Sequence, residues 1–188
     1  ILSEALTLFS TQGYVATSLA DIARASDISK AGLLHHYSSK DQLLAAVLDE
    51  RDRRIVSLLP RAEEGAEAAL DAWVEMVAHN QRHPDGVALY TAMSAAVIDS
   101  KHQAHPWFRE HLIGAISYLV EAFEHGKTTG EVREDAPSEQ IARRLVAISD
   151  GLQVQWLCSR ADGGRALNMH EVMAGVVVDM KERWLRRS

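Results

Sequence analysis

The chain has 188 residues, of which 47% are hydrophobic and 24% are charged, the composition of a globular protein with ample material for a core rather than of a disordered chain. Its apolar runs are shorter than the roughly 18 residues that a membrane span requires, and no signal-like segment opens it, so we expect a cytoplasmic protein without a membrane partner. The formal net charge of −6 lacks the basic excess that phosphate-binding chains normally show.

Apolar side chains at helical spacing predict a first helix that includes residues 2–9. Ile1 continues this pattern, so we expect residues to precede it in the natural chain. Ser18 and Asp21 have the spacing of a capping box, in which the hydroxyl accepts a bond from a free amide and the carboxylate reaches back. A second helix is therefore predicted to begin at Ser18.

The second helix is predicted to stop at a tight turn. Ser26 and Asp27 are typical turn residues, Ile28 is apolar and can plug the core, and Ser29 can cap a third helix that runs to Tyr37. Helices this short need each other to bury their apolar sides. Together the three predict a helix-turn-helix unit, which lays its last helix in the DNA major groove.

The third helix has residues suited to DNA. The positions nearest the bases are Ser29, Lys30, Ala31 and Gly32. Small side chains let the backbone approach the duplex, while His35 and His36 can donate to phosphate oxygens. Ser39 and Gln42 have the spacing of another capping box, and Lys40 lies at that helix start, where a phosphate is favoured.

A spaced set of motifs covers about the first quarter of the chain. The motifs are Leu-Phe-x-x-x-Gly-Tyr at 8–14, Thr-Ser at 17–18, Asp-Ile-Ala at 21–23, Ser-Lys at 29–30 and His-Tyr-x-Ser-Lys-Asp-x-Leu at 36–43. They resemble the N-terminal domain of TetR-type repressors, and the resemblance adds DNA contacts at Thr17, Ser18 and Tyr37. Leu34 stands where many members carry a phosphate-contacting tyrosine. Asp27 replaces the usual turn glycine, so we expect it in the left-handed conformation.

The predicted helix-turn-helix domain, which we call the head, is not basic. The placement of its charges matters more than their sum. The charged residues of 1–48 are Arg24, Lys30 and Lys40 against Glu4, Asp21, Asp27 and Asp41. All three cations lie in or beside the proposed contact helices, and a dimer doubles them. We therefore expect modest, salt-sensitive DNA binding.

The rest of the chain reads as helices. Helical periodicity extends over 41–59 up to Pro60, then over 66–83, 87–99, 107–124 and 141–157, and again from Leu167 after a loop at 161–164. No strand-like alternation of any length appears. The fold predicted is all-α with about nine helices, divided into a helix-turn-helix domain at 1–45 and a helical ligand-binding and dimerisation domain at 46–188.

The helix predicted at 141–157 is apolar on nearly every side, and the helix from Leu167 has one broad apolar face, so we expect that one monomer does not cover both. A two-fold dimer in which both helices of each chain form a four-helix bundle resolves this, and the resemblance agrees. The interface is predicted at Ile148, Leu152, Trp156, Met169, Val172, Val176 and Met180. The single cysteine, Cys158, excludes an internal disulfide, and its apolar neighbours suggest a buried structural thiol.

The resemblance also implies a small-molecule pocket between the body helices. The lining is predicted at Met93, Val97, Phe108, His111, Leu152 and Gln155, although core packing is the simpler interpretation for any one of them. The function predicted is a homodimeric transcriptional repressor, bound to a palindromic operator and released by a small, largely apolar effector.

Other classes of protein find less support. His79 and His83 are four residues apart on one helix, as metal ligands would be, but the segment lacks the glutamate of the zinc-protease motif. No nucleophile elbow or phosphate-cradling loop is present, so we expect no enzyme, no metal and no cofactor. The main rival is a helical ligand- or metal-binding protein whose N-terminal unit is a protein-interaction surface.

Overall fold

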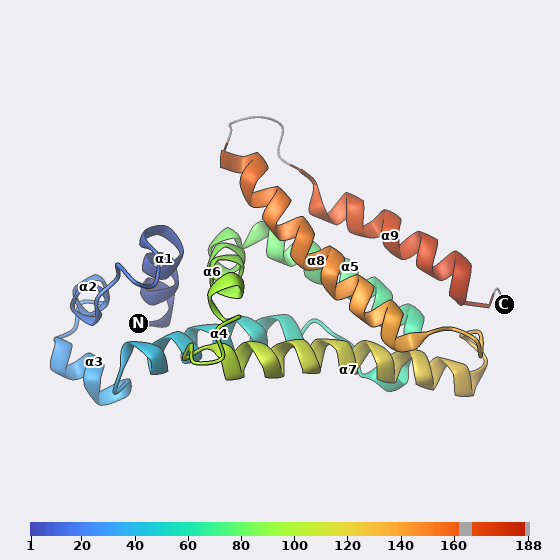
Figure 1. Cartoon of the computed structure of the whole chain (residues 1–188), viewed down its shortest axis with the longest axis horizontal. Helices are drawn as coiled ribbons and strands as arrows, with labels where there is room; N and C mark the ends of the chain where they lie inside the picture. The colour runs from blue at the N-terminus through green and yellow to red at the C-terminus, as the bar shows by residue number, and fades with distance from the viewer. Residues whose placement is uncertain (162–166, 187–188) are drawn as a thin grey trace. The chain divides into compact units, whose positions relative to one another are not determined.

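A computed structural model describes residues 1–161 and 167–186, which form an all-α structure (Figure 1). The helices are α1 (Leu2–Gln12), α2 (Leu19–Ala25), α3 (Lys30–His36), α4 (Lys40–Val56), α5 (Ala66–Arg82), α6 (Pro84–Ala96), α7 (His105–Thr129), α8 (Ser138–Ala161) and α9 (Met169–Trp184), with a 3₁₀ turn, η1 (Ala62–Glu64). The predicted fold class is confirmed. The predicted loop at 161–164 lies almost entirely outside the described residues.

Two compact units divide the chain, and each contains two segments of it. The first unit comprises Ile1–Arg54 and His83–Arg109, and the second comprises Ile55–Arg82 and Glu110–Ser188. The first unit thus holds α6 and the start of α7 in addition to the residues predicted as the N-terminal domain.

The first unit is built around one apolar core. Phe9, Ile22, Leu33, Leu44 and Leu89 are all buried in it, and they come from five different helices, α1 to α4 and α6. The two short helices α2 and α3 therefore gain their stability from α1 and α4, because helices of seven residues are not stable alone.

Polar and aromatic contacts bind α6 and the start of α7 to α4. The rings of Tyr90 and Phe108 stack with centroids 5.0 Å apart, and the guanidinium of Arg51 lies 4.7 Å from the centroid of Tyr90. The indole Nε1 of Trp107 donates to the Asp49 carboxylate at 2.8 Å. Residues 83–109 are consequently part of the same body as the N-terminal helices.

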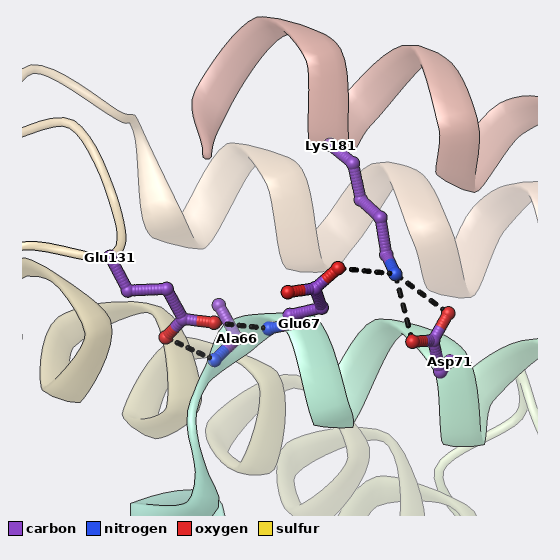
Figure 2. Close-up of polar contacts among 5 residues, drawn as sticks. All are labelled: Ala66, Glu67, Asp71, Glu131 and Lys181. Carbon is purple, nitrogen blue, oxygen red and sulfur yellow. Dashed lines mark hydrogen bonds and ion pairs between the residues drawn. The ribbon is translucent and has the colours of Figure 1, made fainter. Parts of the chain in front are cut away.

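The second unit packs α9 against α5 and α8, and polar contacts hold the three helices together. Figure 2 shows Lys181 of α9 donating to Asp71 at 2.8 Å and to Glu67 at 3.2 Å, both on α5. The Trp73 indole of α5 donates to the Ser149 hydroxyl of α8 at 3.0 Å, in the interior.

The start of α5 is capped from a distant loop. The Glu131 carboxylate accepts the backbone N–H groups of Ala66 at 3.0 Å and Glu67 at 2.7 Å (Figure 2). A carboxylate is favourable there because it satisfies free amides at the positive end of the helix dipole. Gly65, with a φ of 102°, leaves room for the carboxylate, since an added Cβ would lie 2.6 Å from Glu131 Oε2.

Most helix ends after the helix-turn-helix differ from the prediction by a few residues, and two of them differ for clear local reasons. Helix α4 ends at Val56 rather than at Pro60, because its last turn tightens into bonds from Leu58 to Ile55 and from Leu59 to Val56 ahead of the proline. The break between the helices predicted at 66–83 and 87–99 consists of His83 alone. Helix α6 begins at Pro84, because a proline fits the first position of a helix.

The thiol of Cys158 is exposed on α8, so the prediction of a buried structural thiol is wrong. Trp156, two residues earlier, is buried, but side chains two positions apart on a helix point about 200° apart and so lie on opposite sides of it.

Candidate nucleic-acid interface

The start of α2 has the capping box that the sequence predicts. The Asp21 amide donates to the Ser18 hydroxyl at 3.2 Å, and the Asp21 carboxylate accepts the Ser18 amide at 3.1 Å. The same carboxylate accepts from Arg24 at 2.6 Å. The bonds from Ser18, assisted by Arg24, lower the pKa of Asp21, so the cap is ionised at neutral pH.

The turn between α2 and α3 closes through a left-handed residue. Asp27 has a φ of 54°, which confirms the prediction. Around it the Ile28 amide donates to the Ala23 carbonyl at 3.0 Å and the Asp27 amide to the Arg24 carbonyl at 3.2 Å, the pattern of a Schellman motif. Ile28 then packs against the core, which fixes the angle at which the chain enters α3.

Helix α3 presents most of its surface to solvent. Ser29 caps it by accepting the Gly32 amide at 3.0 Å. Leu33 is fully buried and anchors the helix to the core. The exposed side chains are those of Lys30, Ala31, Leu34, His35 and His36. One anchored face and a continuous free face are what a helix needs to enter the major groove while its unit stays folded.

The ammonium group of Lys40 is engaged within the first unit. Its Nζ donates to the carbonyls of Tyr14 at 2.8 Å, Thr17 at 3.0 Å and Val15 at 3.3 Å, and lies 4.4 Å from the centre of the Tyr14 ring. The Tyr14 hydroxyl in turn donates to Asp41. Burial, together with the Asp41 carboxylate, raises the pKa of Tyr14 above its ordinary value. Lys40 thus holds the segment between α1 and α2.

The other predicted contacts divide by burial. Thr17 is buried, and its hydroxyl lies within hydrogen-bonding distance of the Gly13 and Leu8 carbonyls, so its side chain supports the fold. Ser18 is exposed at the start of α2, and Tyr37 is half-buried against the core. Together with the free face of α3, Ser18 forms the candidate nucleic-acid interface.

The predicted ligand-lining residues fall in both units. Met93, Val97 and Phe108 are buried in the core of the first unit, where they pack with the N-terminal helices. His111, Leu152 and Gln155 belong to the second unit, with Leu152 buried and Gln155 exposed. The described residues hold no group of three or more His, Cys, Asp or Glu side chains placed to bind a metal ion.

The predicted dimer residues have three degrees of exposure. Leu152, Trp156 and Met169 are buried within the single chain. Ile148, Val176 and Met180 are half-buried. Val172 is exposed, as are Val154 of α8 and Val178 of α9, two apolar side chains outside the predicted set. The exposed apolar surface of α8 and α9 therefore includes one predicted residue, Val172, and two that were not predicted, Val154 and Val178.

Comparison with known proteins agrees with this geometry. Residues 1–47 match the model of the family described as bacterial regulatory proteins, tetR family. The chain is 24% identical over 188 residues to the HTH-type transcriptional repressor AcnR of Corynebacterium diphtheriae, which covers 100% of this chain and 90% of that protein. It is 25% identical over 171 residues to the A-factor receptor protein of Streptomyces griseus, covering 88% of this chain and 56% of the receptor.

The fold also matches a solved structure. A TetR transcription regulator from Haloarcula marismortui superposes with a TM-score of 0.78 at 22% identity, covering 98% of each chain. The anchored α3, its Schellman turn and these relatives define a DNA-binding transcriptional regulator rather than an enzyme. The resemblance predicted from the sequence is thus confirmed for residues 1–47, which match the DNA-binding domain of the TetR family. None of the described helices combines the length and apolar character needed to cross a bilayer.

Proposed function

We propose that this regulator is a cytoplasmic homodimeric repressor that binds a palindromic operator and leaves it when a small, largely apolar effector binds. Residues 1–45 read the DNA, and residues 46–188 dimerise and hold the effector. The observation that carries the proposal is α3, whose Leu33 is fully buried while Lys30 and its exposed neighbours face solvent. The AcnR relative, which is named a repressor, supports the direction of control.

The exposure of the α3 side chains supports the proposed DNA contacts. Lys30, Ala31 and Gly32 approach the base edges, and His35 and His36 donate to phosphates. The interface also includes Ser18, Ser29 and Tyr37. Lys40 contributes its charge to the field of the head and its hydrogen bonds to the fold.

A dimer is proposed because one chain leaves apolar surface on adjacent helices. Val154, Val172 and Val178 have 49%, 39% and 54% of their surface exposed, on α8 and α9, which pack against each other. A two-fold axis beside these helices buries both copies of that surface in a four-helix bundle. It also pairs two heads, which must lie about 35 Å apart to reach successive major grooves.

The binding energy of a small apolar effector is large enough to drive the proposed release from DNA. A ligand that buries about 250 Å² of apolar surface gains roughly 6 kcal/mol at about 25 cal/mol per Å². About 5.5 kcal/mol inverts a 1:99 equilibrium between two spacings of the heads, provided that the ligand fits only one of them. The relative named the A-factor receptor protein supports a regulator that responds to a bound effector. In the second unit we propose His111, Leu152 and Gln155 as contacts.

A gel-shift titration against the gene's own upstream DNA tests the proposal. The wild-type protein should give one shifted band with the mass of a dimer on DNA, and Lys30→Glu should abolish it. Lys101→Glu is the matched control, because it makes the same charge change at an exposed residue outside the helix-turn-helix. Loss of binding in both variants, or in neither, would contradict the assignment of α3, and a monomer in sedimentation at micromolar concentration would contradict the dimer.

A further inference from the structure

Leu34 is a large apolar side chain on the free face of α3. It has 40% of its surface exposed, whereas its neighbour Leu33 is fully buried. Lys30 lies four residues earlier and Ala31 three residues earlier, so all three occupy adjoining positions on the helix surface. An exposed leucine contributes nothing to the core of the first unit and is free to contact a partner.

The partner of this face is the major groove, which limits what a leucine can contact. A leucine side chain has no hydrogen-bond donor, so it cannot donate to a phosphate oxygen. The C5-methyl group of thymine is the apolar group that base pairs present in the major groove. A contact between two apolar groups there excludes water from both.

We infer that Leu34 reads a thymine methyl group in each operator half-site, and that Lys30 reads a guanine beside it. Four residues of helix rise about 6 Å, and base pairs are spaced by about 3.4 Å, so the two bases lie within about two base pairs of each other. Lysine pairs with the O6 and N7 acceptors of guanine. The inference rests on the proposed function, since it requires α3 in the groove.

The probe is the duplex that wild-type protein enriches from a randomised DNA library. Each thymine is replaced in turn by deoxyuridine, which removes only the methyl group, and affinity is measured for wild type and for Leu34→Ala. We expect replacement at one thymine of each half-site to weaken wild-type binding about fourfold, the value of one buried methyl group. The same replacement should change the affinity of Leu34→Ala by less than 1.5-fold.

Two controls keep the result interpretable. Ile98→Ala shortens another exposed apolar side chain of the same unit, at 81% exposure, and should retain the wild-type response to deoxyuridine. Leu34→Gln keeps the length of the side chain and should behave as Leu34→Ala, with thermal unfolding showing that both variants fold.

Three outcomes would overturn the inference. They are a wild-type protein insensitive to every deoxyuridine, an equal sensitivity in Leu34→Ala, and a sensitive thymine with no guanine within about two base pairs of it in the enriched duplex. If no duplex is enriched at all, the proposed function fails and the inference fails with it.

Discussion

Replacing Lys40 with methionine separates a structural role from a role in phosphate binding. Methionine keeps the length and apolar stem of lysine and removes only the ammonium group. That group donates to the carbonyls of Tyr14, Val15 and Thr17 and lies over the Tyr14 ring. We therefore expect Lys40→Met to destabilise the head, with any loss of DNA affinity following from unfolding.

The size of the effect can be worked out from the contacts. A hydrogen bond to a charged group contributes about 1.5–3 kcal/mol, but three bonds that share one half-exposed ammonium are not additive. We expect a loss of about 2 kcal/mol in the free energy of unfolding, which is roughly a thirtyfold change in the folding equilibrium. A phosphate contact would instead add about 0.9 per head to the slope of log affinity against log salt concentration, or about 1.8 for a dimer.

Urea unfolding at fixed protein concentration and DNA titrations at several salt concentrations distinguish the two roles. Lys40→Met should unfold at lower urea and keep the wild-type salt slope. Lys30→Met is the matched control, since its exposed ammonium should leave stability unchanged and reduce the slope. If Lys40→Met is as stable as wild type and its salt slope falls by about 1.8, the structural assignment of Lys40 is wrong.

Three further substitutions test single contacts. Asp27→Val should lower the free energy of unfolding by about 1–2 kcal/mol, because Asp27 has a φ of 54°, which a branched side chain tolerates poorly. Asp27→Gly should not lower it, and equal losses in the two variants would contradict this. Glu131→Ala should cost about 1.5 kcal/mol in urea unfolding by removing the cap of α5, and Glu134→Ala, exposed in the same loop, less than about 0.5. Trp73→Phe should cost about 1–2 kcal/mol, since the Ser149 hydroxyl loses a buried donor; a Tm equal to that of wild type would refute this.

The local features of the head could be predicted from the sequence. The capping box of Ser18 and Asp21 and the left-handed Asp27 involve residues within one turn of each other, so residue type and spacing determine them. At Ser39 the prediction was half right. Its hydroxyl caps the Gln42 amide, but the Gln42 side chain accepts from Ser38 instead.

Contacts between distant residues could not be predicted in this way. Lys40 binds carbonyls 23 to 26 residues earlier, and Glu131 binds amides 64 and 65 residues earlier. Their partners are backbone groups, which carry no residue-specific signal in a sequence. The division of the chain into units also depends on distant contacts, and the chain passes between the two units at three places.

Most cations of the head are held in contacts within the chain, so the proposed dimer matters for the affinity of this acidic chain for DNA. Arg24 is paired with Asp21, and the Lys40 ammonium is bonded to carbonyls, which leaves Lys30 as the cation on the free face of α3. A single head with so few phosphate contacts binds weakly, because phosphate neutralisation supplies most non-specific affinity. Two linked heads raise the effective concentration of the second at its half-site, which increases affinity by a factor of about 10² or more without any new contact. In the proposed dimer, specific occupancy of the operator would thus depend on the spacing of the heads, and the proposed effector would remove the larger part of the affinity by altering that spacing.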